Sequence, residues 1–358
     1  MSYDFDRIIE RRHSDSIKWR LYDEDVLPLW VADMDFLAPE PVTEALAARV
    51  QHGVFGYAQE PPELREALVA WLARGDGVLV QTPVYPPILS APANQGLVRE
   101  DMQLSRDADG RYSVDDALMA ATVSDRTRLF LLCSPQNPTG RTFSDAELGR
   151  MADLCLSRGV TIVSDEIHGD LVHPDARHRP IASLSPEVGA ATITLMAPSK
   201  TFNIPTLGFS LAIIENPGLR KAFRRAMSDI VPHVGALAYT GALAAYTQAE
   251  SWLDACMTYL AGNRDFLVRY IAEHLPGIHM WSPEATYLAW LDCREADLPG
   301  GPYNFFLEHA RVALNDGAAF GEGGAGFVRL NFGCPRATLV QALERMRAAL
   351  DAHRAARQ

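Results

Sequence analysis

The chain has 358 residues, and its 33 lysines and arginines stand against 45 aspartates and glutamates, so the formal net charge is −12. A face that binds phosphates needs an excess of basic residues, so this balance argues against nucleic acid as a partner. It also argues against a lysine-rich protein of the membrane surface. Only three of the 33 bases are lysines, namely Lys18, Lys200 and Lys221, so a lysine in an apolar setting is conspicuous.

The length favours two domains, or one large domain with a smaller companion, because single cores stop growing near roughly 250–300 residues. No apolar run approaches the about 20 residues of a membrane span. The first residues lack a basic region followed by an apolar stretch, so we expect no signal peptide and no membrane partner. The five cysteines are odd in number and contain no C-x-x-C pair, which favours reduced thiols in the cytoplasm.

The elements of the first two thirds alternate between helix and strand patterns. A proline-rich stretch through Pro41 predicts an irregular arm, and helical spacing of apolar residues predicts a helix over 62–74. Ser144 and Glu147 form a capping box before a helix that Gly159 ends. Apolar runs predict strands at 78–80, 128–133, 160–163, 192–196 and 209–214. This alternation predicts an α/β fold with a mostly parallel sheet between helices.

The last third has a different pattern. Residues 235–273 predict long helices, residues 287–291 and 327–332 predict strands, and the apolar spacing after residue 338 predicts a final amphipathic helix. We therefore expect a large domain over 41–252. A smaller α+β domain over 253–358 follows, and residues 1–40 form an N-terminal arm.

Polar residues follow three of the predicted strands directly. Asn137 follows the strand at 128–133, Asp165 and His168 follow the strand at 160–163, and Lys200 follows the strand at 192–196. In an open α/β sheet, ligands bind beyond the carboxyl ends of the strands. We therefore expect these four side chains to converge at one edge of the sheet, where the set can hold and activate a heteroaromatic aldehyde.

Each of these residues has a chemical role and a structural alternative. Lys200 can form an imine with a carbonyl, but it can also be a solvated loop lysine. Asp165 can keep a pyridine nitrogen protonated, or it can cap a helix. Asn137 and His168 can bond a ring hydroxyl, although an asparagine between prolines is equally suited to a turn.

Other site motifs fail on their context. The glycine pattern at 321–326 fits G-x-G-x-x-G but precedes a strand, so it does not predict a dinucleotide site. His168 and His173 are five residues apart, unlike a helical metal-binding pair, so we expect no metal. Neither G-x-S-x-G nor G-x-x-x-x-G-K-[ST] occurs.

Several motifs together resemble the class I/II aminotransferase superfamily of pyridoxal 5'-phosphate (PLP) enzymes of fold type I. They are Ser134-Pro-Gln-Asn-Pro-Thr-Gly140, Ser164-Asp-Glu-Ile-His168 and Ala197-Pro-Ser-Lys-Thr-Phe-Asn203. Leu29-Trp-Val-Ala-Asp-Met-Asp-Phe36, Phe55-Gly-Tyr57 and Thr82-Pro-Val-Tyr85-Pro-Pro87 narrow the resemblance to the MalY/PatB-type cystathionine β-lyases, also called C–S lyases. The resemblance runs nearly from end to end of the chain.

The resemblance implies a set of site residues. Lys200 would be the lysine that bonds PLP, Asp165 the partner of the ring nitrogen, and Asn137 and His168 neighbours of the ring hydroxyl. Ser199 would lie near the phosphate, and Tyr57 would reach the phosphate of a neighbouring subunit, which implies a homodimer with shared sites. The other implied contacts are Tyr85 stacked on the ring, Arg329 on the substrate carboxylate, and Trp30 and Asp33 around the substrate. Packing remains the alternative for Tyr57 and Tyr85, and a surface position for Arg329.

The resemblance also implies an activity. The freed Lys200 amine would remove the Cα proton of a cysteine S-conjugate, and loss of the thiolate would lead to pyruvate and ammonia. Two alternatives stay open, namely an aminotransferase that uses the same residues and a catalytically impaired homologue with a regulatory or binding role.

One departure from the family pattern concerns the cofactor phosphate. In the family, a strand, a glycine turn and a helix lie between the positions of Arg74 and Gly75, and the backbone amides of that turn hold the phosphate. This chain lacks the segment, and it has Gly208 where many aminotransferases carry a phosphate-binding arginine. If the segment is truly absent, we expect weak retention of PLP.

Overall fold

The structure is a computed structural model that describes residues 3–14, 16–52, 75–227, 231 and 234–357. The helix expected over 62–74 and the candidate residue Tyr57 lie outside the described residues. Within these ranges, none of the helices combines the length and the apolar character that a membrane crossing requires.

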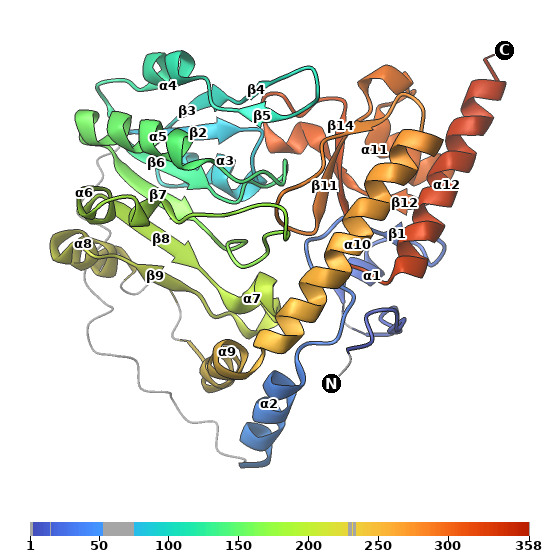
Figure 1. The fold of residues 1–358 in the computed structure, drawn as a ribbon, viewed down its shortest axis with the longest axis horizontal. Coiled ribbons are helices and arrows are strands. Elements are labelled where there is room, and N and C mark those ends of the chain that lie inside the picture. Colours follow the sequence, from blue (N-terminus) through green and yellow to red (C-terminus); the bar gives the residue numbers. More distant parts are fainter. Residues whose placement is uncertain (1–2, 15, 53–74, 228–230, 232–233, 358) are drawn as a thin grey trace.

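Among the described residues, the larger sheet has six strands. They are β2 (Gly77–Thr82), β3 (Val98–Gln103), β6 (Thr127–Cys133), β7 (Thr161–Asp165), β8 (Thr192–Met196) and β9 (Leu211–Ile213). Their order is β3-β2-β6-β7-β8-β9, and all pairs are parallel except β8 with β9 (Figure 1). The expectation of a mostly parallel sheet is confirmed, as are the strands that the apolar runs predict.

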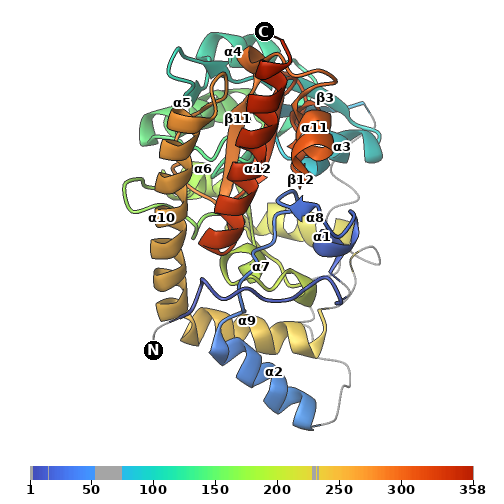
Figure 2. The same cartoon turned by 90° about the vertical axis from the view of Figure 1, so that its right-hand side faces the viewer.

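Helices cover both faces of this sheet. The helices around the sheet are α3 (Pro86–Asn94), α4 (Asp116–Thr122), α5 (Asp145–Arg158), α6 (Pro186–Ala190) and α8 (Pro217–Met227), and the short α7 (Pro198–Thr201) lies beyond the carboxyl end of β8. Figures 1 and 2 show α3 and α5 on opposite sides of the strands. Leu79 of β2 is buried in the core that includes Met151 of α5, whereas the neighbouring Val78 and Val80 are buried with Leu89 of α3. Because successive strand residues point to opposite faces, a strand buried on both sides is apolar throughout.

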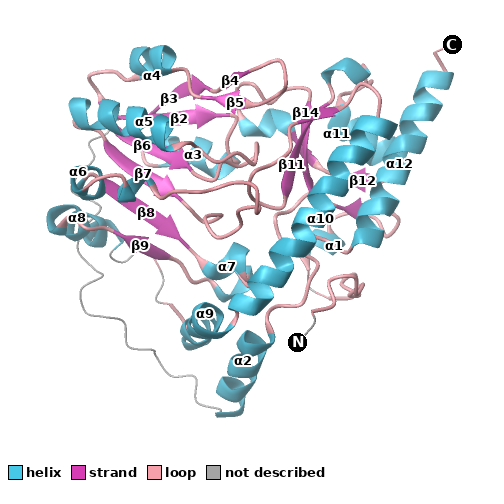
Figure 3. Cartoon of the chain, in the orientation of Figure 1, coloured by secondary structure: helices cyan, strands magenta, loops and turns pink. Residues whose placement is uncertain are grey.

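Among the described residues, the smaller sheet has four strands, which pair antiparallel. They are β10 (His279–Met280), β11 (Leu288–Asp292), β14 (Phe327–Asn331) and β13 (Asn315–Asp316), in the order β10-β11-β14-β13. Beside them lie α10 (Glu250–His274) and α12 (Arg336–Ala355), whose apolar faces share one core with β11 and β14. Figure 3 shows the strands of the larger sheet and of the smaller sheet as two distinct groups. The boundary expected at residues 252 and 253 falls within α10, and the division into domains stays a prediction.

The N-terminal arm contains more regular structure than its prolines predict. It forms α1 (Ile17–Arg20) and β1 (Leu27–Pro28), and α2 (Glu40–His52) follows. Strand β1 pairs with β12 (Val312–Ala313), so the arm is anchored to the C-terminal third of the chain. Helix α2 lies against α9 (Ala236–Gln248), as Figures 1 and 2 show. Further short elements include the hairpin of β4 (Ser105–Arg106) with β5 (Tyr112–Ser113) and the helix α11 (Pro302–Phe305).

Candidate active site

The structure brings the predicted polar residues together at the carboxyl ends of three adjacent strands. Asn137 follows β6, Asp165 is the last residue of β7, and Lys200 lies in α7 directly after β8. Strand β7 pairs with both β6 and β8, so the three ends meet at one edge of the sheet. The convergence expected from the sequence is therefore present.

Lys200 places its amine in a largely buried position. Its Nζ donates a hydrogen bond of 2.7 Å to the carbonyl oxygen of Ala32, which belongs to the N-terminal arm. Burial lowers the pKa of Lys200; the carboxylates of Asp33 and Asp165 raise it, and Arg329 lowers it. The balance favours a neutral amine more than in a solvated lysine, and the neutral amine is the form that attacks carbonyls and removes protons.

Asp165 is a carboxylate in the same buried region. Burial raises its pKa, and the neighbouring Glu166 adds to this effect, while the backbone N–H of Ile167 and the charge of Lys200 lower it. Ile167 donates its N–H to Oδ1 of Asp165 at 3.2 Å, which orients the carboxyl group. A buried carboxylate of this kind favours a bound cation, such as a protonated ring nitrogen.

His168 is buried and uncharged. Burial, Lys200 and Arg329 together lower its pKa to about 3. Among the described residues, its Nδ1 atom has no hydrogen-bond partner. A buried polar atom without a partner is costly, so this nitrogen is suited to bind a polar atom of a ligand.

Arg329 reaches the site from the smaller sheet. Its Nη1 donates to Oδ1 of Asn137 at 2.8 Å, and its Nη2 donates to Oδ1 of Asn315 at 2.6 Å and to the carbonyl of Trp30 at 3.3 Å. The side chain is buried, which lowers its pKa to about 10, so it carries a charge at neutral pH. Arg329 is thus a buried fork of donors, the geometry that binds a carboxylate; the surface position that was its alternative is excluded.

The remaining candidates lie around this group in different ways. Tyr85 precedes α3 with 41% of its surface exposed, and its hydroxyl affects the pKa of Arg329, which indicates that it faces the site. Ser199 lies beside Lys200 in α7. The indole of Trp30 donates to the carbonyl of Lys18 at 3.2 Å. The contact of Trp30 with Arg329 is made by its backbone carbonyl. These assignments remain predictions.

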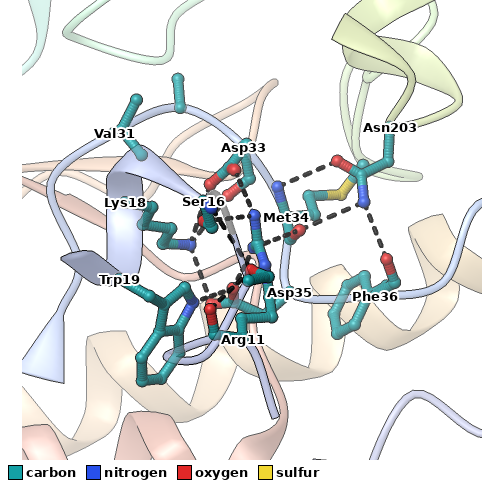
Figure 4. Close-up of polar contacts among 12 residues, drawn as sticks. Arg11, Ser16, Lys18, Trp19, Val31, Asp33, Met34, Asp35, Phe36 and Asn203 are labelled. Carbon is teal, nitrogen blue, oxygen red and sulfur yellow. Dashed lines mark hydrogen bonds and ion pairs between the residues drawn. The ribbon is translucent and has the colours of Figure 1, made fainter. Parts of the chain in front are cut away.

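Asp33 belongs to residues 29–36, which we call the arm loop. This loop is bonded to both sheets: Asn331 of β14 donates to the carbonyls of Val31 and Asp33, each at 2.7 Å. Asn203, three residues after Lys200, accepts from the N–H of Met34 at 3.1 Å and donates to the carbonyl of Phe36 at 2.8 Å (Figure 4). The arm loop therefore joins the lysine of the larger sheet to the arginine of the smaller one.

Several of these contacting residues were missed in the sequence. Tyr287 donates its hydroxyl to Ala32 at 3.3 Å, and Asn315 holds Arg329. Neither residue stands in one of the recognisable motifs. Asn331 lies two residues after Arg329, on the same face of β14, and this spacing is the signal that could have pointed to it.

The comparisons with known proteins identify the class. The family model of aminotransferase class I and II matches residues 62–346, and the chain therefore belongs to this family. It is 36% identical to cystathionine beta-lyase PatB of Bacillus subtilis, over 97% of this chain and 100% of PatB. It is 33% identical to protein MalY of Escherichia coli, over 94% of this chain and 96% of MalY. Cystalysin from Treponema denticola, whose structure contains PLP, is 29% identical with a TM-score of 0.90, over 99% of this chain and 100% of cystalysin. The resemblance to the MalY/PatB type is confirmed.

The lengths of these alignments bear on the predicted absent segment. The alignment with PatB spans 387 positions, whereas 97% of the 358 residues of this chain is about 347, which leaves about 40 positions without a residue of this chain. The alignment with MalY spans 377 positions against about 337 residues, which leaves the same difference. The relatives thus have additional residues within the aligned region, in agreement with a missing segment. Its location between Arg74 and Gly75 stays a prediction.

Proposed function

We propose that this chain is a PLP-dependent carbon–sulfur β-lyase of the cystathionine β-lyase type, which converts a cysteine S-conjugate to pyruvate, ammonia and a thiol. The observation that carries the proposal is the largely buried Lys200 amine, with its lowered pKa, at the strand ends where Asp165 also lies and which Arg329 reaches from the smaller sheet. An amine with this character serves both as nucleophile and as general base near neutral pH. The similarity to PatB, which is named a cystathionine beta-lyase, supports the same reaction class.

The residues at the strand ends suit the ring of PLP. Asp165 offers a buried carboxylate to the ring nitrogen, and His168 offers a nitrogen without a partner among the described residues. When bound, PLP supplies an aldehyde carbon for bond formation and a ring that withdraws electrons from the substrate Cα. The ring end of the site therefore fits the cofactor.

The side chains of the site have separate roles in proton transfer and in substrate binding. Lys200 takes the proton from the substrate Cα, because burial lowers the pKa of its amine and the arm loop holds it through the Ala32 carbonyl. Arg329 binds the substrate carboxylate, and Asn137 orients it through the 2.8 Å bond to Nη1. Asp33 and Trp30 would contact the substrate, Tyr85 would stack on the ring of PLP, and Ser199 would lie near its phosphate, as the family resemblance implies.

The deciding experiment is an absorbance titration with PLP and an assay of the products. Wild-type protein should develop a band near the visible edge and should release pyruvate and thiol from cystathionine. Lys200→Ala should lose the band and at least about 1,000-fold of the activity, in line with the loss of a residue that acts as nucleophile and base. Lys221→Ala, which removes an exposed lysine of α8, is the matched control and should behave as wild type. Absence of the band in wild type with excess PLP would refute the proposal, and amino transfer without release of thiol would favour an aminotransferase.

The proposed enzyme is a homodimer with shared sites. Exposed apolar side chains on α2 and on α9 support an interface there, namely Val50, Leu243 and Tyr246, with exposed fractions of 54%, 66% and 46%. Exposed apolar patches of this kind commonly mark interaction surfaces. For this dimer, the family resemblance implies that Tyr57, which lies outside the described residues, would reach the PLP phosphate of the other subunit.

The proposed compartment is the cytoplasm. The five cysteines are all buried and unpaired, which agrees with a reducing environment. Their pKa values are raised by burial, so these thiols are structural groups and not reactive ones.

A further inference from the structure

Lys18 is a buried lysine that is not among the candidate site residues. It is 1% exposed, and its Nζ lies 2.9 Å from the carbonyl oxygen of Asp33, 2.8 Å from Oδ2 of Asp35 and 3.3 Å from Oδ1 of Asp33 (Figure 4). The ammonium group thus donates hydrogen bonds to two of these oxygens, and the third, Oδ1 of Asp33, is an ion-pair contact without a hydrogen-bond partner among the described residues. A planar guanidinium has its donors in a fixed fork and cannot direct them from one nitrogen to three oxygens. This geometry explains a lysine in a chain that otherwise uses arginine.

Lys18 belongs to a closed group of four charges, which we call the arm cluster: Arg11, Lys18, Asp33 and Asp35. Arg11 bonds both carboxylates, with Nη2 at 2.8 Å from Oδ2 of Asp33 and Nη1 against Oδ1 of Asp35. The indole of Trp19 donates to Asp35 as well, at 2.8 Å. Arg11 and Lys18 therefore share both carboxylates. Removal of one of these cations leaves each carboxylate with a single positive partner.

The arm cluster and Lys200 both bond the arm loop. Lys18 ends on the carbonyl of Asp33 and Lys200 on the carbonyl of Ala32, so two of the three lysines bond consecutive carbonyls. Asn203 fixes the same loop through Met34 and Phe36. The position of the acceptor for Lys200 therefore depends on contacts that Lys18 makes.

The charge around Lys200 depends on the same cluster. The groups that act on its amine are Asp33 and Asp165, which favour the charged form, and Arg329, which opposes it. The fourth neighbour, His168, is neutral. Asp33 is also paired with Lys18 and Arg11. These two positive charges partly offset its negative charge, so the net electrostatic effect on the pKa of Lys200 depends on their presence.

We propose that Lys18 is a positioning residue of the active site: it holds the carboxylate and the carbonyl of Asp33. It thereby fixes the negative charge near the Lys200 amine and, through the adjoining peptide, the Ala32 carbonyl that accepts from Lys200. This inference rests on the proposed role of Lys200. It adds to that role a residue of the N-terminal arm that touches neither substrate nor cofactor.

The test measures the reactivity of Lys200 directly, on full-length protein freed of PLP. Trace acetylation with acetic anhydride at a series of pH values gives the pH at which the Lys200 amine is half reactive, and peptide masses are simple to assign because the chain has three lysines. In Lys18→Met, Asp33 retains one cation fewer, so the midpoint should rise by about half a pH unit and labelling near neutral pH should fall about threefold.

Two further variants separate this effect from a loosened fold. Asp33→Asn removes the negative charge that favours the charged amine, so its midpoint should fall and its labelling should rise. A loosened structure would expose Lys200 and change both variants in the same direction. Lys221→Met removes the exposed lysine of α8, which lies on the opposite side of the molecule from α1 (Figure 1), and should keep the wild-type profile.

The outcomes are decisive in either direction. A folded Lys18→Met protein whose Lys200 profile equals that of Lys221→Met would overturn the proposal. If Lys18→Met does not melt cooperatively, Lys18→Gln replaces it, because the amide keeps donors for Asp33 and Asp35 but lacks the charge. The midpoint of Lys200 labelling should again shift upward in this variant. An unchanged midpoint would overturn the proposal. Since the labelling needs no PLP, a failure of the protein to bind PLP leaves this test intact and instead refutes the proposed function.

Discussion

Two buried histidines show how the interior of this protein selects a protonation state. His168 has its pKa lowered to about 3, mainly by burial, and His173 has its pKa lowered to about 4 by burial and by the nearby Arg264. The Nε2 atom of His173 lies 3.0 Å from the carbonyl of Thr286, so the neutral ring donates there. Both rings are therefore neutral across the physiological range, and they take up a proton more readily in the unfolded chain.

This difference predicts a loss of stability in acid. The unfolded histidines bind protons near pH 6.5, whereas the folded ones remain neutral to about 4 and about 3, so the free energy of unfolding should fall as the pH drops below 6.5. His173→Gln keeps a donor for Thr286 and removes one of these protons, so the slope between pH 6 and pH 5 should be smaller by about 1 kcal/mol per pH unit. Urea unfolding at several pH values measures this slope. His13→Gln, at an exposed position, is the control, and equal slopes for the two variants would contradict the prediction.

At the scale of elements, α5 is the helix whose ends the sequence specifies most clearly. Ser144 and Glu147 form both bonds of a capping box, with 3.3 Å from the Glu147 N–H to the Ser144 hydroxyl and 2.9 Å from the Ser144 N–H to the Glu147 carboxylate. Glu147 also pairs with the buried Arg141, and Gly159 ends the helix with a φ of 64°.

Removal of the cap should therefore destabilise the protein without changing the site. We expect Ser144→Ala to lower the free energy of unfolding by about 1 kcal/mol, because the first turn loses an acceptor for its N–H groups. Ser157→Ala on the same helix removes an exposed hydroxyl that bonds only the carbonyl of Leu154 among the contacts described, and it should change stability by less than about 0.5 kcal/mol. Chemical unfolding of the two variants compares them directly. A similar effect of both would show that the capping box contributes little.

The elements also show where prediction from sequence succeeds. Strands β6, β7 and β8 are continuous apolar runs because the sheet is buried on both faces, and parallel pairing then places Asn137, Asp165 and Lys200 at one edge. Strands of two residues, such as β1, have no periodic pattern and exist through pairing with a distant segment. The bond of Arg329 to Asn137 joins residues 192 positions apart, and no local pattern encodes it. The local patterns therefore predict that Asn137, Asp165 and Lys200 meet at one edge, whereas the contact that joins Arg329 of the smaller sheet to them follows only from the fold.

At the scale of the whole molecule, the site is built where three parts of the chain meet. The larger sheet and α7, which directly follows it, supply Asp165 and Lys200, and the smaller sheet supplies Arg329. The arm loop bonds Lys200 through the Ala32 carbonyl and Arg329 through the Trp30 carbonyl. A change in the arm is therefore able to affect the lysine and the arginine together. The chain is also shorter than its relatives in the aligned region. The alignments leave about 40 positions without a residue of this chain, yet every candidate residue for the PLP ring is present.

The missing positions predict an unusual preference among cofactor forms. If they comprise the segment between Arg74 and Gly75 that holds the phosphate in the family, the phosphate adds little affinity, because Gly208 provides no cation and the Thr201 hydroxyl already donates to Asp170 at 3.0 Å. We expect PLP and pyridoxal, which lacks the phosphate, to bind within about tenfold of each other, a difference of about 1.4 kcal/mol. Absorbance titrations of wild type with each compound measure the two affinities, and Lys200→Ala corrects for binding elsewhere. A preference for PLP of a hundredfold or more would show that other residues of this chain bind the phosphate.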